Sequence, residues 1–138
     1  MKTNSIIKLL VAIVLLGTNT TILAQIPITE KSFQERVVKR ALYGMNSEIP
    51  SIVESSLFLI LEVKNRYPNE DYTKILDKLN ELVSSGKTIS IRYKAQLATL
   101  FFNYHEQFKE VKITENDNPD KYFRMIAGKI ENNSFALN

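Results

Sequence analysis

The chain has 138 residues, with 18 lysines and arginines against 15 aspartates and glutamates, a single histidine and no cysteine. The lack of cysteine excludes disulfide bonds, thiol catalysis and zinc sites built on cysteine ligands. The length is typical of one domain that holds together by core burial alone, and no linker or low-complexity tract indicates a second domain.

The N-terminus has the pattern of an export signal. Lys2 and Lys8 supply positive charge, the run Leu9–Leu16 is uncharged and apolar, and a polar stretch then leads to the small residue Ala24. This order is that of a secretory signal peptide, and the run is shorter than the roughly 20 residues that span a bilayer. We therefore expect cleavage after Ala24 and a secreted or periplasmic helical domain over residues 25–138. An uncleaved N-terminal anchor is the alternative.

Removal of the signal changes the charge of the chain. The signal contains Lys2, Lys8 and no acid, so the remaining domain has 16 basic and 15 acidic residues. A net charge this close to zero gives no general case for binding nucleic acid or an anionic membrane. We accordingly expect no nucleic-acid partner and no stable membrane insertion after cleavage.

The first two expected helices differ in how far their apolar residues extend around the helix. The first spans residues 30–45, with Thr29 as its N-cap and a single apolar stripe. The second spans residues 48–67, with Ser47 as its cap and Pro50 in the first turn, where a missing N–H costs nothing. Its apolar residues cover most of its circumference, which predicts a helix packed between neighbours.

The next two helices repeat this alternation. The third spans residues 70–85, is apolar on one side, and has Asn69 as its expected cap. Gly86 is its expected stop, because glycine accepts the left-handed conformation that ends many helices. The fourth spans residues 89–108 after the cap Thr88 and is apolar on several sides, so we expect a second central helix.

A last helix is expected over residues 119–130, preceded by Asp117 or Asn118 as its cap. The ordered core is therefore expected over about residues 30–130. We expect residues 131–138 to fray.

A weak internal repeat has an offset of 39 residues. Ser51-Ile52 matches Ser90-Ile91, and Phe58 matches Leu97, each at the same place in its helix. A helical period near 40 residues is typical of HEAT and armadillo arrays.

The chain resembles HEAT-like helical repeats in three segments: residues 47–67 with Pro50 in the first turn, residues 71–83, and residues 91–95. The resemblance covers residues 33–108 and extends to small secreted bacterial HEAT-like proteins, which are mostly uncharacterised. It implies an all-α fold, a right-handed stack of antiparallel helix hairpins with about two and a half units, and binding to other proteins. An irregular five-helix bundle is the alternative.

His105 is the candidate for acid–base chemistry, since no other histidine and no cysteine is present. With Glu106 or Glu110 it would make a general base in a water-accessible pocket. The alternative is a half-buried histidine packed among neighbouring phenylalanines. A second histidine at zinc-protease spacing is missing and the acids are dispersed, so we expect no catalytic residues, no metal site and no cofactor.

The candidate binding residues combine cations with tyrosines, a composition typical of binding hot spots. They are Arg36, Lys39, Arg40 and Tyr43 on the outer side of the first helix, and Arg92, Tyr93 and Lys94 in the first turn of the fourth. The alternative is an ordinary solvated helix face, with Glu35 and Lys39 as an ion pair.

These patterns predict a non-catalytic secreted or periplasmic interaction module that binds a protein or an envelope component. A small helical ligand-binding protein or enzyme using His105 and nearby carboxylates is the alternative. Self-association is a third prediction, because the end helices of a short repeat array leave apolar surface uncovered.

Overall fold

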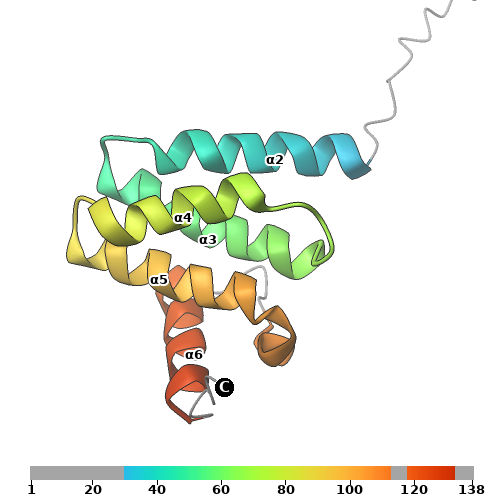
Figure 1. Cartoon of the computed structure of the whole chain (residues 1–138), viewed down its shortest axis with the longest axis vertical. Helices are drawn as coiled ribbons and strands as arrows, with labels where there is room; N and C mark the ends of the chain where they lie inside the picture. Colours follow the sequence, from blue (N-terminus) through green and yellow to red (C-terminus); the bar gives the residue numbers. More distant parts are fainter. Residues whose placement is uncertain (1–29, 113–117, 133–138) are drawn as a thin grey trace, which may run out of the picture.

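The computed structural model describes residues 30–112 and 118–132, and all regular structure in these ranges is helical (Figure 1). The all-α class expected from the sequence is therefore confirmed. The elements are α2 (Glu30–Met45), α3 (Pro50–Arg66), α4 (Thr73–Ser85), α5 (Ile89–Asn103), the short 3-10 helix η1 (His105–Phe108) and α6 (Pro119–Asn132). The expected signal peptide, the cap Thr29, Asp117 and residues 133–138 lie outside the described residues.

The helices pack as two consecutive pairs. α2 packs against α3 and α4 against α5, while α3 also contacts α5 and α2 contacts α4. α6 crosses α5 steeply on the side away from α2 (Figure 1). The resemblance grouped residues 47–67 with 71–83, which are α3 and α4, but the close partners of α3 are α2 and α5.

The core is contributed by every one of these helices. Its fully buried side chains include Met45, Leu57, Ile60, Ile75, Leu79, Ala95, Ala98, Phe101, Phe108, Tyr122 and Ile126. α5 buries residues on several sides, because it packs against α3, α4 and α6 together. The expectation that this helix is central is confirmed, and its small residues Ala95 and Ala98 are wholly buried.

The starts of α3 and α4 were predicted incorrectly. α3 begins at Pro50 without a side-chain cap, and Ser47 instead accepts a hydrogen bond from the N–H of Ile49 at 3.1 Å. α4 begins at Thr73, whose N–H donates to the Asp71 carboxylate at 2.9 Å. In both cases the side chain bonds two residues ahead in a local turn, and this turn precedes the first helical residue.

Two other caps were predicted correctly. The Thr88 hydroxyl accepts the N–H of Ile91 at 3.1 Å and caps α5. Asn118 accepts the N–H of Asp120 at 2.9 Å at the start of α6. α6 continues to Asn132, two residues past its expected end.

The fourth helix is shorter than expected, since α5 ends at Asn103 and η1 follows. Phe108 is fully buried, with its ring centroid 5.4 Å from that of Phe101. Residues seven apart in a continuous α-helix lie about 10 Å apart along its axis. The break after Asn103 therefore brings Phe108 back onto the core.

Two glycines are required by close contacts. A Cβ added at Gly44 would overlap the hydroxyl of Ser56, where α2 meets α3. Gly86 does not adopt the expected left-handed conformation, since its φ is −56° and its ψ is 136°. A Cβ there would lie 2.6 Å from the carbonyl oxygen of Leu82 and 2.8 Å from Ile91, so space and not backbone freedom requires glycine.

We expect Gly44→Ala to lower the free energy of unfolding by about 1–3 kcal/mol, because the added methyl group overpacks the contact with Ser56. Gly128→Ala is the matched control, since nothing lies within 4 Å of its added Cβ. In the middle of α6 this change removes a flexible residue and raises the free energy of unfolding by about 0.5–1 kcal/mol. Denaturant unfolding followed by circular dichroism measures both, and the same sign for the two variants would contradict the explanation.

Candidate functional site

The outer side of α2 presents the four residues predicted there. Arg36, Lys39, Arg40 and Tyr43 are exposed, and the side chain of Tyr43 is 84% exposed. Spacings of three, four and seven place them on one side of the helix. Within the described residues no acid pairs with these cations, and the alternative ion pair between Glu35 and Lys39 is not formed. This side of α2 is therefore open and positively charged.

The three residues predicted on α5 have different environments. Tyr93 is exposed, whereas the Arg92 guanidinium donates to the carbonyl oxygen of Gly86 at 2.8 Å. The side chain of Lys94 is only 12% exposed. Lys94 therefore does not belong to an open surface.

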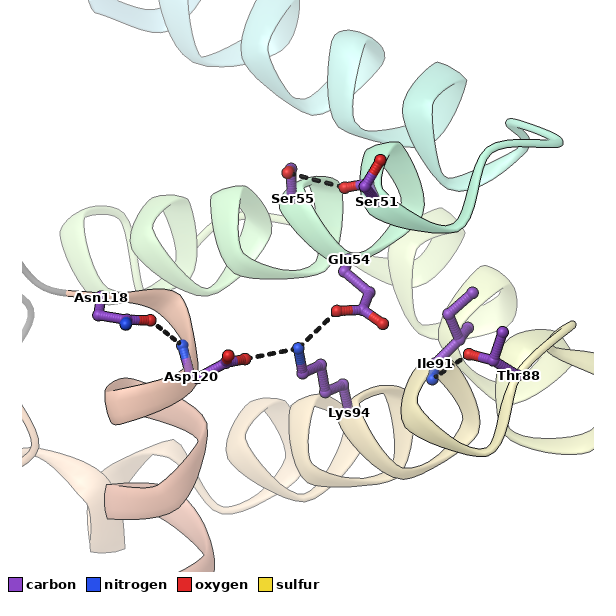
Figure 2. Close-up of polar contacts among 8 residues, drawn as sticks. All are labelled: Ser51, Glu54, Ser55, Thr88, Ile91, Lys94, Asn118 and Asp120. Carbon is purple, nitrogen blue, oxygen red and sulfur yellow. Dashed lines mark hydrogen bonds and ion pairs between the residues drawn. The ribbon is translucent and has the colours of Figure 1, made fainter.

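Lys94 is the centre of an ion-pair network that joins three helices. Its amine lies 2.6 Å from the carboxylate of Glu54 on α3 and 2.7 Å from that of Asp120 on α6, as Figure 2 shows. It also lies 5.5 Å from the ring centroid of Phe123. The sequence placed Lys94 with the binding residues because position alone does not distinguish an exposed lysine from a paired one.

The charges of this network support one another. The hydrogen bond from Lys94 lowers the pKa of Glu54, and it lowers the pKa of Asp120 in the same way. Burial opposes the charged amine of Lys94, but the bonds to Asp120 and Glu54 outweigh burial and raise its pKa. The network therefore stabilises the fold while all three groups are charged.

We expect Lys94→Met to lower the free energy of unfolding by roughly 1–2 kcal/mol at neutral pH. This lies between the typical cost of removing an exposed ion pair and that of breaking a buried one, because Lys94 is largely buried and Asp120 is exposed. The carboxylates of Glu54 and Asp120 have lower pKa values in the folded chain than their unfolded values of 4.5 and 3.8. Their bonds to Lys94 therefore stabilise the fold fully at a pH above those unfolded values. That stabilisation is lost as the pH falls through the folded values. The difference between wild type and variant should thus shrink under acid.

Lys109→Met is the matched control, because Lys109 pairs with Glu106 in a highly exposed position. We expect it to change the free energy of unfolding by less than about 0.5 kcal/mol. Urea unfolding across the acid range measures both variants. An equal loss for Lys94→Met at every pH would mean that packing, and not charge, explains its effect.

The predicted binding residues of α2 and those of α5 do not lie on one common face of the protein. α3 and α4 lie between α2 and α5, as Figure 1 shows. Tyr43 is near the end of α2 and Tyr93 near the start of α5, so both lie toward the end where the turns 46–49 and 86–88 are found.

Sequence reasoning missed three exposed isoleucines at this end of the molecule. Ile49, Ile52 and Ile89 are all exposed, although Ile52 was counted in the apolar surface of a buried helix. Ile49 is the N-cap residue of α3 and Ile89 is the first residue of α5, so both precede the buried stripe of their helix. That position was the signal available in the sequence.

His105 lines a pocket of about 340 Å³ together with Lys64, Pro68, Asn69, Phe102 and residues of the η1 turn. The ring of His105 packs edge-on against Phe101, with centroids 5.2 Å apart. Burial lowers the pKa of His105, and the charge of Lys64 lowers it further, so the neutral imidazole is favoured. The pocket meets one requirement of the enzyme alternative.

The second requirement is a carboxylate that converges on His105. Glu106 lines the same pocket, but both candidate acids form ion pairs with lysines. Glu106 pairs with Lys109, and Glu110 pairs with Lys129 at 2.8 Å. The Nε2 atom of His105 is buried and has no hydrogen-bond partner in the described part of the chain. The Lys64 amine is also engaged, by the Pro68 carbonyl at 2.5 Å and by the ring of Tyr72.

No group of three or more potential metal ligands occurs within residues 30–112 and 118–132. In the same ranges, none of the helices combines the length and the apolar character needed to cross a bilayer. No family model matches the chain, and comparison with curated proteins and with solved structures found no match. The resemblance to HEAT-like repeats therefore stays a prediction.

Proposed function

We propose that the chain is exported by its N-terminal signal and acts, after cleavage behind Ala24, as a non-catalytic binding module for a protein or an envelope component. The binding face is the outer side of α2, with Arg36, Arg40 and Tyr43 at its centre. One observation carries the proposal: Tyr43 is 84% exposed beside cations that no acid neutralises within the described residues. Exposed arginine with tyrosine is the composition of binding hot spots.

The packing of the helices supports a repeat-like framework for this role. α2–α3 and α4–α5 are two consecutive pairs. The first helix of one pair contacts the first helix of the other, and the second helices contact each other in the same way. We propose that this is a short HEAT-like stack, right-handed, with α6 as an additional helix. Stacked repeats of this kind present extended surfaces that bind partners.

The pairing of the acids near His105 supports a role without catalysis. A general base needs a positioned proton acceptor and, in most sites, a second group that orients it. Lysines neutralise both acids nearest in sequence to His105. The alternative, a small ligand-binding protein or enzyme that uses His105 and nearby carboxylates, is favoured by the pocket that His105 and Glu106 line.

Affinity capture from the native envelope tests the proposal with the exported protein, whose N-terminus mass spectrometry should place at Gln25. We expect the double variant Arg36→Glu, Arg40→Glu to lose partners that the wild type retains, because it reverses the charge of the α2 face. The matched control is Lys74→Glu, Arg124→Glu, which makes the same change of charge at exposed positions of α4 and α6.

Capture of the same partners by both double variants would overturn the assignment of the α2 face. Loss of a bound small molecule in His105→Ala, with all partners retained, would favour the pocket alternative.

A further inference from the structure

The turns 46–49 and 86–88 lie next to each other at one end of the molecule (Figure 1). Several exposed apolar residues belong to these turns or to the adjoining parts of the helices. Ile89 is 78% exposed and Ile49 is 54% exposed, and Tyr43, Ile52 and Tyr93 are exposed beside them. We name these five residues the turn end. Isolated exposed apolar residues are ordinary, but a group of this size at one end marks an interaction surface.

Direct contacts hold the parts of the turn end together. The Lys87 amine pairs with the Glu48 carboxylate and lies 3.2 Å from the carbonyl oxygen of Glu48, which joins the two turns. A Cβ at Gly44, next to Tyr43, would lie 3.6 Å from Ile52. The fold therefore brings the two turns together, although they lie about 40 positions apart in the sequence.

The charge around the turn end is positive. Arg36, Lys39 and Arg40 lead along α2 to Tyr43, and no acid in the described residues pairs with them. Glu48 is the only acid in the two turns, and Lys87 pairs with it. Apolar residues next to exposed cations are complementary to a partner surface that has an apolar interior and negative charges at its boundary with water.

We propose that the turn end docks on an anionic lipid surface. Ile49 and Ile89 enter the interfacial layer, Tyr43 and Tyr93 lie at headgroup depth, and Arg40 contacts the lipid phosphates. Arg36, one turn farther along α2, adds attraction over about a Debye length. A lipid surface is one of the envelope components proposed above. The inference therefore rests on the proposed function and names the partner of the α2 face.

Two features favour a lipid surface over a second copy of the chain. In a symmetric dimer through the turn end, Arg40 of each copy would approach the like charges of the other, which is unfavourable. The apolar side chains also stand at the protruding turns of two hairpins, and a lipid interface accepts protruding side chains without a complementary groove.

Co-sedimentation of the exported, processed protein with vesicles tests the proposal. One set of vesicles contains phosphatidylcholine with about 30% phosphatidylglycerol, and the other contains phosphatidylcholine alone. We expect binding to the anionic vesicles at about 50 mM salt and a strong loss at about 500 mM, where charges are screened. We expect no binding to the neutral vesicles.

Two double variants separate the contributions of charge and apolar side chains. We expect Arg36→Glu, Arg40→Glu to reduce partitioning at least about tenfold, since each cation near an anionic surface contributes roughly fivefold. We expect Tyr43→Ser, Ile89→Ser to reduce it about tenfold by removing apolar groups that enter the interface. Lys74→Glu, Arg124→Glu should stay within about twofold of wild type.

Several results would overturn the docking proposal. If Tyr43→Ser, Ile89→Ser binds the anionic vesicles as well as wild type, only unspecific electrostatic attraction explains the binding. If the control Lys74→Glu, Arg124→Glu loses as much binding as Arg36→Glu, Arg40→Glu, the turn end has no special role. If the anionic vesicles fail to bind the protein while envelope capture still depends on Arg36 and Arg40, the partner is a protein. The lipid inference is then wrong, and the binding module remains. Circular dichroism of each variant verifies the helical fold.

Discussion

The burial of α5 on several sides is the constraint on which the rest of the structure depends. Without cysteine the chain has no disulfide cross-links, so its helices must hold one another by packing. α5 contacts α3, α4 and α6, and its fully buried Ala95 and Ala98 let neighbouring helices approach closely. The break after Asn103 completes this core, because it returns Phe108 to contact Phe101.

The same arrangement decides which charges are structural and which are free. Lys94 lies where α3, α5 and α6 meet, and two carboxylates hold it there. The cations of α2 lie on an outer helix and have no such neighbours in the described residues. The mature domain expected from the sequence is almost neutral in total, yet the cations on the outer side of α2 form no ion pair within the described residues. Total charge therefore does not predict the charge of this surface.

Much of the fold was predictable from local pattern. The positions of α2, α4 and α6 follow from one-sided apolar stripes, and Thr88 and Asn118 cap their helices as expected because each side chain reaches an amide two or three residues away. The errors arose at the ends of helices. Ser47 and Asp71 accept bonds from amides two residues ahead in local turns, so α3 and α4 begin later than predicted. Gly86 ends α4 as predicted, but it is glycine because Leu82 and Ile91 leave no space for a Cβ.

The sequence by itself determined the helical class, the approximate helix positions, the absence of thiol chemistry and the exposed character of Arg36, Arg40 and Tyr43, since these depend on composition and on short spacings. The tertiary structure alone decided that Lys94 is the centre of an ion-pair network, that α3 pairs with α2, and that the turns 46–49 and 86–88 lie together. These features join residues about 15 to 40 positions apart along the chain, and no local spacing rule encodes which of several possible distant contacts forms.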